Sequence, residues 1–250
     1  MSDAIVLSVG REVRRSPLPG HTSLRDAAGA DGRPGDKEIA ALRQRVIEQP
    51  RFGRRCWYCH VGFGLTEMYE VHHLDGDHGN DSPDNVVPIC LLCHIPWHLD
   101  LVVQSWANDP GRIIFLPELS QQELNTLLYA LFFHSEATID KSPENKVVEE
   151  AERVAAAVYE RLASRDMDVE QVHGQAVRPG LSKVQGMVRT LQSLEPAEYS
   201  QRAELFDGCR YLPPWAPMLA IAPSLAVNGA MFNRLQIDSW SAVASQHGAY

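Results

Sequence analysis

The sequence predicts an α+β fold, in which a small module of short strands and helices precedes a mainly helical region. Two Cys-x-x-Cys pairs, at 56–59 and 90–93, enclose a segment that contains strand-like and turn-rich stretches. Apolar residues at helical spacing then fill 120–134 and 143–164. Hydrophobic residues make up 44% of the 250 residues, which is enough to bury a sizeable core.

The first 35 residues are expected to form an N-terminal arm and a flexible linker. Residues 4–9 (AIVLSV) fit either a short strand or an ordered arm. Residues 16–36 are rich in Pro, Gly, Ala and Asp, which is typical of a linker. An amphipathic helix is predicted over 37–49, with Asp36 as its N-cap, because its apolar residues recur at helical spacing.

The rest of the chain divides into three predicted parts. We place the first module at 36–116, because residues 112–116 (RIIFL) predict a strand at its end. A mainly helical region follows at 117–210, and its first helix opens with the capping-box signature Ser-x-x-Glu. The tail, 211–250, is expected to be irregular but apolar enough to pack against the rest. Helices are predicted over 120–134, 143–164, 181–194 and 196–207.

Four of the five cysteines have the spacing of a zinc site. Cys56, Cys59, Cys90 and Cys93 form two pairs, and a two-residue gap lets each pair grip one metal ion. Such pairs fit a metal site in a reducing compartment better than disulfides. Four thiolates around tetrahedral Zn²⁺ leave no position for a substrate, so the zinc would be structural. The alternative is that these four are unrelated buried cysteines. The remaining Cys209 is expected to be a buried cysteine of this ordinary kind.

The histidines of the same segment form a second candidate site. LLCHIPWHLDLVV predicts a helix, on which His94 and His98 share a face and could ligate one metal ion. His72 and His73 stand in a strand-like stretch, MYEVHHL, that runs into a loop dense in turn residues.

This stretch resembles the HNH (ββα-metal) endonuclease motif, including its cysteine-rich variants. The resemblance rests on His72-His73, Asn85-Val86 and Cys90-x-x-Cys93-His94, within EVHHLDGD and SPDNVVPIC. It implies that the module at 36–116 is an HNH-like ββα-metal zinc module.

The resemblance also implies a role for each residue. His72 and His94 would be ligands of a second divalent ion, and His98 would be a candidate third ligand of the same ion. His73 would be the general base that activates water, and Asn85 would fix the loop and orient His73. The alternative is that these side chains only tie the loop together through hydrogen bonds.

The charge of this region argues against cleavage of a nucleic acid. From Cys56 to Gly111 the sequence has no Lys and no Arg, and the whole chain has a net charge of −9. Phosphate contacts need Lys or Arg, so the active face would repel a nucleic-acid backbone. HNH nucleases typically carry a basic residue after the last motif histidine, where this chain has Ile95, Pro96 and Trp97. The acidic residues of the same stretch are Glu67, Glu70, Asp75, Asp77, Asp81, Asp84, Asp100 and Asp109.

Five arginines between residues 43 and 55, directly before the first cysteine pair, favour a nucleic-acid partner as an alternative. Arg51, Arg54 and Arg55 could form a phosphate clamp beside the zinc, in a protein that binds DNA without cleaving it. The alternative is a solvated helix face and loop, to which Arg43 and Arg45 also belong.

The order of motifs from about Leu42 to Pro214 resembles the IcmJ/DotN family of the type IVB (Dot/Icm) secretion systems and its relatives on conjugative plasmids. The resemblance rests on PGRIIFLPELSQQELNTLLYALF, VYERLASR, PGLSKVQGMVRTL and YSQRAELFDGCRYLPP, in this order. It implies an HNH-like fold used as a non-enzymatic adaptor in the coupling complex, at the cytoplasmic face of the inner membrane. Such adaptors bind the C-terminal extension of the coupling ATPase, beside other secretion adaptors.

The preferred function is therefore a non-catalytic zinc-binding adaptor, and the alternative is a metal-dependent HNH endonuclease that acts on DNA. We expect a cytoplasmic protein, peripheral at the inner membrane through the coupling complex. Direct membrane insertion is not expected, because no apolar run approaches the ~20 residues that span a bilayer. Some apolar residues would belong to the core or, where exposed, could receive a segment of the ATPase. These are Leu127, Leu128, Leu131, Phe132, Trp215 and Met218.

Overall fold

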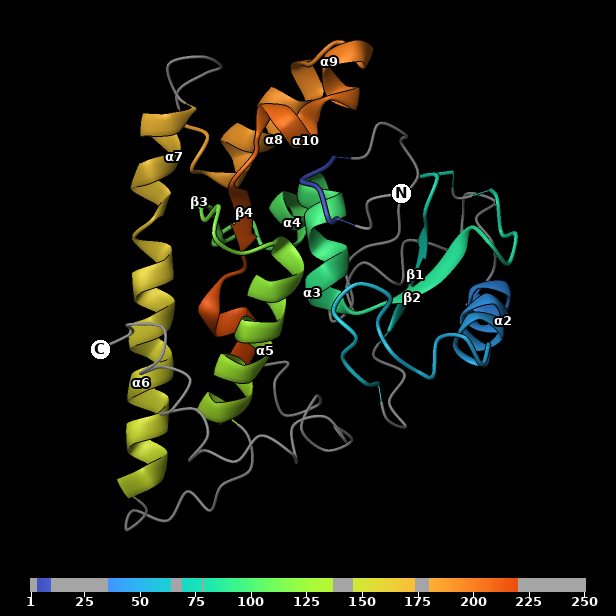
Figure 1. Ribbon diagram of the computed structural model, residues 1–250, viewed down its shortest axis with the longest axis horizontal. Helices are drawn as coiled ribbons and strands as arrows, with labels where there is room; N and C mark the ends of the chain where they lie inside the picture. Colours follow the sequence, from blue (N-terminus) through green and yellow to red (C-terminus); the bar gives the residue numbers. More distant parts are fainter. Residues whose placement is uncertain are drawn as a thin grey trace.

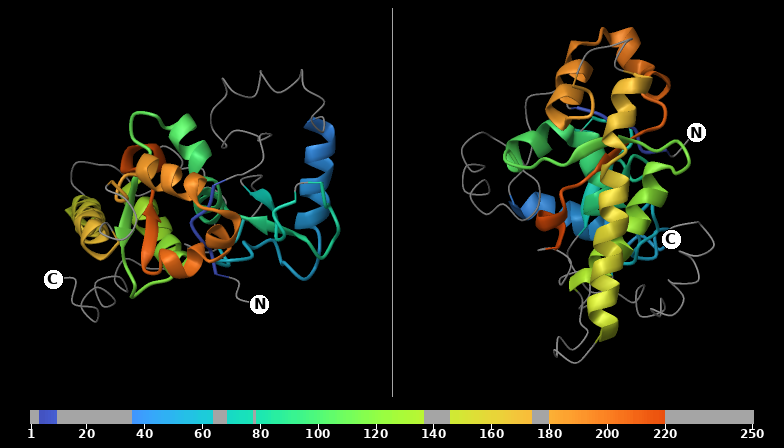
Figure 2. Two further views of the ribbon diagram at one scale, coloured as in Figure 1. Left: turned by 90° about the horizontal axis from the view of Figure 1, so that it is seen from above. Right: turned by 90° about the vertical axis from the view of Figure 1, so that its left-hand side faces the viewer.

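Within the part of the chain that the structure describes, the fold has two short antiparallel sheets and helices packed around them, which confirms the α+β class (Figure 1). Helix α2 (Asp36–Ile47) and the first sheet lie at one end of the molecule, and helix α6 (Lys146–Ala163) lies at the other end (Figure 1, Figure 2). The computed structural model describes residues 4–9, 36–63, 69–77, 79–136, 146–173 and 180–219.

The first sheet and the helix after it carry most of the predicted site residues. β1 (Glu70–His73) and β2 (Val86–Ile89) pair antiparallel, and α3 (Leu91–His94) follows. Strand, strand and helix thus come in ββα order. β2 is buried along its whole length, which fits its unbroken apolar sequence VVPI.

The helix predicted from LLCHIPWHLDLVV is divided into three short pieces. After α3, a 3₁₀ turn, η2, spans Ile95–His98, and α4 spans Leu99–Ser105. Pro96 explains the break, because its nitrogen carries no hydrogen for a helical hydrogen bond. The prediction of a single helix is therefore wrong at this point.

The strand predicted over 112–116 does not close the first module. β3 (Arg112–Phe115) pairs antiparallel with β4 (Cys209–Leu212), which belongs to the end of the chain. The boundaries drawn after 116 and 210 therefore divide a single sheet, because residues 211 and 212 of the predicted tail belong to β4. Residues 220–250 of that tail lie outside the described residues. The sequence CRYL is too short for its pattern to predict a strand without knowledge of its partner.

The helices of the second half lie near their predicted positions. α5 and α6 run side by side (Figure 1), while the predicted helix 196–207 is split into α9 and α10, and α7 was not predicted. Residues 143–145 of the predicted helix 143–164 lie outside the described residues. None of the helices in the described ranges is long and apolar enough to cross a membrane. The remaining bounds are α5 Gln121–Glu136, α7 Asp166–Val172, α8 Val184–Ser193, α9 Pro196–Ser200 and α10 Arg202–Leu205.

Most of the apolar residues considered for a docking surface belong to the core. Leu128, Leu131, Phe132 and Met218 are buried, whereas Leu127 and Trp215 are half-buried and pack against the same core. The ring centroid of the tail residue Trp215 lies 4.8 Å from that of Tyr159 in α6, with the two rings tilted by 50°. These side chains therefore stabilise the fold and do not offer an open apolar face.

The N-terminal residues 4–9 form an ordered arm and not a strand. The main-chain N of Ser8 donates to Pro96 O at 2.8 Å, and Leu99 N donates to Ser8 O at 3.1 Å. Ile5, Leu7 and Val9 are buried, so the arm is part of the core. Most of the predicted linker, residues 10–35, lies outside the described residues.

Glu170 of α7 makes stability depend on pH. Its carboxylate accepts hydrogen bonds from Gly180 N at 3.2 Å and Ser182 N at 3.0 Å. Partial burial raises the pKa of Glu170, but these main-chain donors outweigh it and hold the pKa below the usual 4.5. The ionised carboxylate therefore contributes to the stability of the fold above pH 4.5, and this contribution is lost as the pH falls through the lowered pKa. Glu170→Gln should therefore destabilise the protein by about 1 kcal/mol near pH 7 and by progressively less in acid.

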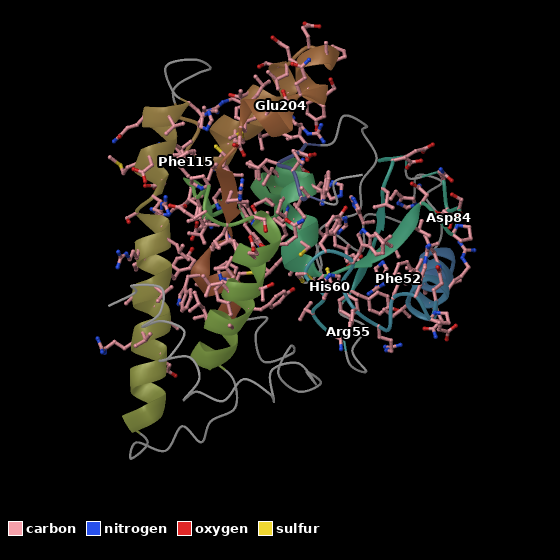
Figure 3. All side chains as sticks on the ribbon, in the orientation of Figure 1. Phe52, Arg55, His60, Asp84, Phe115 and Glu204 are labelled. Atoms are coloured by element: carbon pink, nitrogen blue, oxygen red, sulfur yellow. The ribbon has the colours of Figure 1, made fainter. Side chains whose placement is uncertain are left out.

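Thermal unfolding measured from pH 7 down to pH 3 checks this expectation. Glu204→Gln, at an exposed position of α10 (Figure 3), serves as the matched control and should unfold like the wild type. If the stability that Glu170→Gln loses relative to the wild type does not become smaller in acid, the electrostatic explanation is contradicted.

Candidate metal centre

The four paired cysteines converge on one point at the start of α3, next to α5. Cys56 and Cys59 lie in the turn after α2, and Cys90 and Cys93 flank the start of α3. All four sulfur atoms lie within 4.8 Å of one another, and the sulfurs of Cys59 and Cys90 are 3.5 Å apart. A zinc ion with Zn–S bonds of 2.3 Å requires tetrahedral S···S distances of about 3.8 Å. The geometry of the cysteine cage, as we call these four residues, therefore fits a zinc ion.

The electrostatics of the cysteine cage allow four thiolates only beside a cation. Burial is the main cause that raises the pKa of Cys90 and Cys93 well above the usual range. Burial also raises the pKa of Cys56, but hydrogen bonds from the other three cysteines outweigh it and lower that pKa. Three thiols can thus stabilise one thiolate, and further thiolates need positive charge. The stretch 56–111, which carries the cage, contains no Lys or Arg, and a bound metal ion would supply this charge.

The turn that presents the first cysteine pair holds a strained residue. His60 follows Cys59 with φ at +58°, and its main-chain N donates to Cys56 O at 3.0 Å. A side chain in this left-handed region costs roughly 1 kcal/mol, which glycine avoids. His60 is exposed beside the cage (Figure 3), so replacing it removes no buried contact.

We expect His60→Gly to stabilise the zinc-loaded protein by about 0.5–1 kcal/mol, as measured by urea unfolding. His60→Ala is the matched control, because it removes the imidazole and keeps the Cβ atom. An equal gain in both variants would show that the imidazole, and not the backbone conformation, causes the strain.

Three histidines form a second cluster next to the cage. His72 of β1, His94 of α3 and His98 of η2 each place a ring nitrogen within 4.8 Å of the others. The Nε2 atoms of His94 and His98 are 3.1 Å apart, close to the roughly 3.3 Å between two ligands of tetrahedral zinc. The i, i+4 pair predicted for a continuous helix therefore comes together across the break at Pro96. Three imidazoles could hold a metal ion and would leave one coordination position open.

His73 and Asn85 lie beside this cluster but contact the hairpin loop. His73 is 7% exposed, and its Nε2 lies 2.9 Å from Asp81 Oδ1. The Nδ2 of Asn85 donates to Asp75 Oδ1 and to Asn80 O, both at 2.8 Å, and its Oδ1 accepts from Asp75 N. The side chain of Asn85 thus braces the loop between β1 and β2. These contacts favour the interpretation that the motif ties the loop together.

The arginines before the first cysteine pair largely hold the module together. Arg45 donates to Asp81 O at 3.4 Å, and Arg51 pairs with Asp84 at 3.5 Å and donates to Pro83 O. Arg55 donates to His60 O at 3.4 Å. Since these guanidinium groups link α2 and the following turn to main-chain oxygens and an acidic loop, they favour the interpretation as a solvated face over a phosphate clamp.

Two buried residues at this site were not predicted from the sequence. Asn125 of α5, 1% exposed, donates from Nδ2 to Cys93 Sγ at 3.4 Å. Tyr129, one turn later, is also buried, and burial followed by the nearby Cys90 raises its pKa well above the usual range. Both residues lie in an apolar helical pattern more than thirty positions after Cys93, and no local signal connects them with the cysteines.

No protein-family model matches the chain. The chain is similar to Type 4 apparatus protein DotN of Legionella pneumophila, with 26% identity over 211 residues. This match covers 84% of the present chain and 82% of that protein. A stretch of this length in 250 residues necessarily includes both cysteine pairs, all three clustered histidines and helices α5 to α8.

Proposed function

We propose that this protein is a Dot/Icm-type component of a type IV secretion apparatus and acts there as a non-catalytic zinc-binding adaptor. The similarity to Type 4 apparatus protein DotN over most of both chains carries this proposal. A shared metal motif alone would match only the segment around the cysteines, whereas this match includes the helical region. We further propose that the module from α2 to α4 has the HNH-like ββα-metal fold, with structural zinc in the cysteine cage.

The proposed partner is the C-terminal extension of the coupling ATPase, together with other secretion adaptors. In this arrangement the protein lies at the cytoplasmic face of the inner membrane. The charge distribution supports a protein partner over a nucleic acid. Residues 56–111, which contain both candidate ligand clusters, have no Lys or Arg, and the preceding Arg45 and Arg51 contact the hairpin loop.

Genetic complementation tests this proposal. Deletion of the gene should abolish type IV transfer, and a plasmid copy of the wild type or of His73→Ala should restore it. Cys93→Ser should fail to restore transfer, because it removes a ligand of the cysteine cage. Transfer that continues at the wild-type level after deletion would contradict the proposed function.

A metal-dependent HNH endonuclease is the second candidate, and the three-histidine cluster is the observation that favours it. A divalent ion held by His72, His94 and His98 would neutralise a phosphate, and the neighbouring His73 would accept a proton from water. The lack of Lys and Arg around the cluster weighs against binding of the DNA backbone.

We expect the purified protein to leave plasmid and single-stranded DNA uncut in the presence of Mg²⁺, Mn²⁺ or Ni²⁺. Gel electrophoresis of the two substrates measures this, with His73→Ala as the matched control. Cleavage by the wild type that disappears in His73→Ala would establish the endonuclease and make the adaptor role secondary.

A further inference from the structure

A chain of buried amide groups connects the cysteine cage with the second sheet. Asn125 Nδ2 donates to Leu92 O at 3.0 Å and to Cys93 Sγ at 3.4 Å. Gln121, one turn earlier on α5 and 2% exposed, donates from Nε2 to Asn125 Oδ1 at 2.9 Å. The same Nε2 donates to Tyr211 O of β4 at 3.0 Å, and Gln121 Oε1 accepts from Tyr211 N at 2.8 Å.

The main chain of β4 fixes the orientation of both amides. A main-chain N–H can only donate and a carbonyl can only accept, so Tyr211 determines which end of the Gln121 amide carries nitrogen. The second hydrogen on Gln121 Nε2 then faces Asn125, which must present its oxygen there. The nitrogen of Asn125 is thereby directed at Leu92 O and Cys93 Sγ, both of which accept. Reversing either amide would bring two acceptors together in a buried site.

We propose that Asn125 is a positioning residue of the metal centre, whose N–H···S bond stabilises the Cys93 thiolate and raises the affinity of the cysteine cage for zinc. Gln121 and β4 act through Asn125 by holding its amide in place. This inference rests on the zinc site proposed above. Four thiolates outweigh one Zn²⁺ by two negative charges, and each hydrogen-bond donor to a sulfur offsets part of that excess. The main-chain N of Cys90, 3.4 Å from Cys56 Sγ, does the same on the other side of the cage.

Cobalt binding to the full-length protein tests the inference, because Co²⁺ in a thiolate site shows sulfur-to-metal charge-transfer absorption. Asn125→Leu is expected to lower the affinity for Co²⁺ and Zn²⁺ by roughly 10- to 100-fold in chelator competition. The charge-transfer band should also move to lower energy, because Cys93 Sγ no longer accepts a hydrogen bond that stabilises its lone pairs. Gln121→Leu, which does not touch a sulfur, should give a smaller change in the same direction.

Leu128→Ala separates this role from a loss of stability. Leu128 lies on the same helix and is 0% exposed, so its truncation should lower the unfolding temperature without moving the band. An unchanged affinity and band in Asn125→Leu would overturn the inference and leave the cage intact. If that variant does not fold, an unchanged band in Gln121→Leu overturns it. A wild-type protein that binds neither metal would overturn the cage and this inference together.

Discussion

Cys93→Ser is expected to release the zinc ion and to unfold the module from α2 to α4. Structural zinc contributes on the order of 10 kcal/mol to the folding of small zinc domains, which is comparable to the whole stability of a typical domain. Cys93 is 0% exposed, and the sulfurs of Cys56 and Cys90 beside it are also buried. Without the ion, metal–sulfur bonds no longer hold the two cysteine pairs together. Metal content by elemental mass spectrometry and unfolding by circular dichroism measure the two effects.

Cys209→Ala is the matched control for this substitution. Cys209 is also buried, at 3% exposed, and burial raises the pKa of its thiol to about 12, but it lies outside the four-cysteine cluster. The control should keep its zinc and lose only about 1 kcal/mol for the small cavity. A Cys93→Ser protein that stays folded with full zinc content would show that the cysteine cage is not the metal site.

Gly186→Ala is expected to destabilise the protein by about 3 kcal/mol, although alanine favours helices over glycine by about 1 kcal/mol. A Cβ atom at Gly186 in α8 would lie 1.8 Å from the main-chain oxygen of Gly180. The loop that carries this oxygen cannot move away easily, because Glu170 holds Gly180 N and Ile113 N of β3 donates to Ser182 O at 2.9 Å. The steric clash therefore outweighs the helix propensity.

Urea unfolding of Gly186→Ala and of Gly62→Ala checks this expectation. Gly62 is the matched control, because no atom lies within 4 Å of the Cβ that alanine would add there, and its φ is not positive. Gly62→Ala should stay within about 0.5 kcal/mol of the wild type. A stabilised Gly186→Ala would mean that α8 and the loop before it are not packed as described.

The sequence predicted the α+β class and the residues that gather at the two ligand clusters. Both depend on short-range patterns. Two-residue gaps place each pair of cysteines on one turn, and a spacing of four brings His94 and His98 together even though Pro96 divides the helix. The ββα order was expected from the resemblance to the HNH motif, and the local pattern predicted only its first strand.

The features that the sequence did not predict depend on contacts between distant segments. β3 finds its partner β4 almost a hundred residues later, so a boundary based on local composition separated them. The amide chain from Cys93 through Asn125 and Gln121 to Tyr211 likewise joins four separate positions, and an Asn and a Gln in a helical pattern carry no sign of it. The proposed adaptor function depends on the similarity to DotN and on charge, because the site residues alone fit an endonuclease equally well.

The adaptor function is tested most directly by titrating the purified, zinc-loaded protein with the C-terminal extension of the coupling ATPase in an isothermal calorimeter. The account predicts saturable binding with a defined stoichiometry, which His73→Ala retains and Cys93→Ser loses. Failure of the wild type to bind any segment of that extension would contradict it.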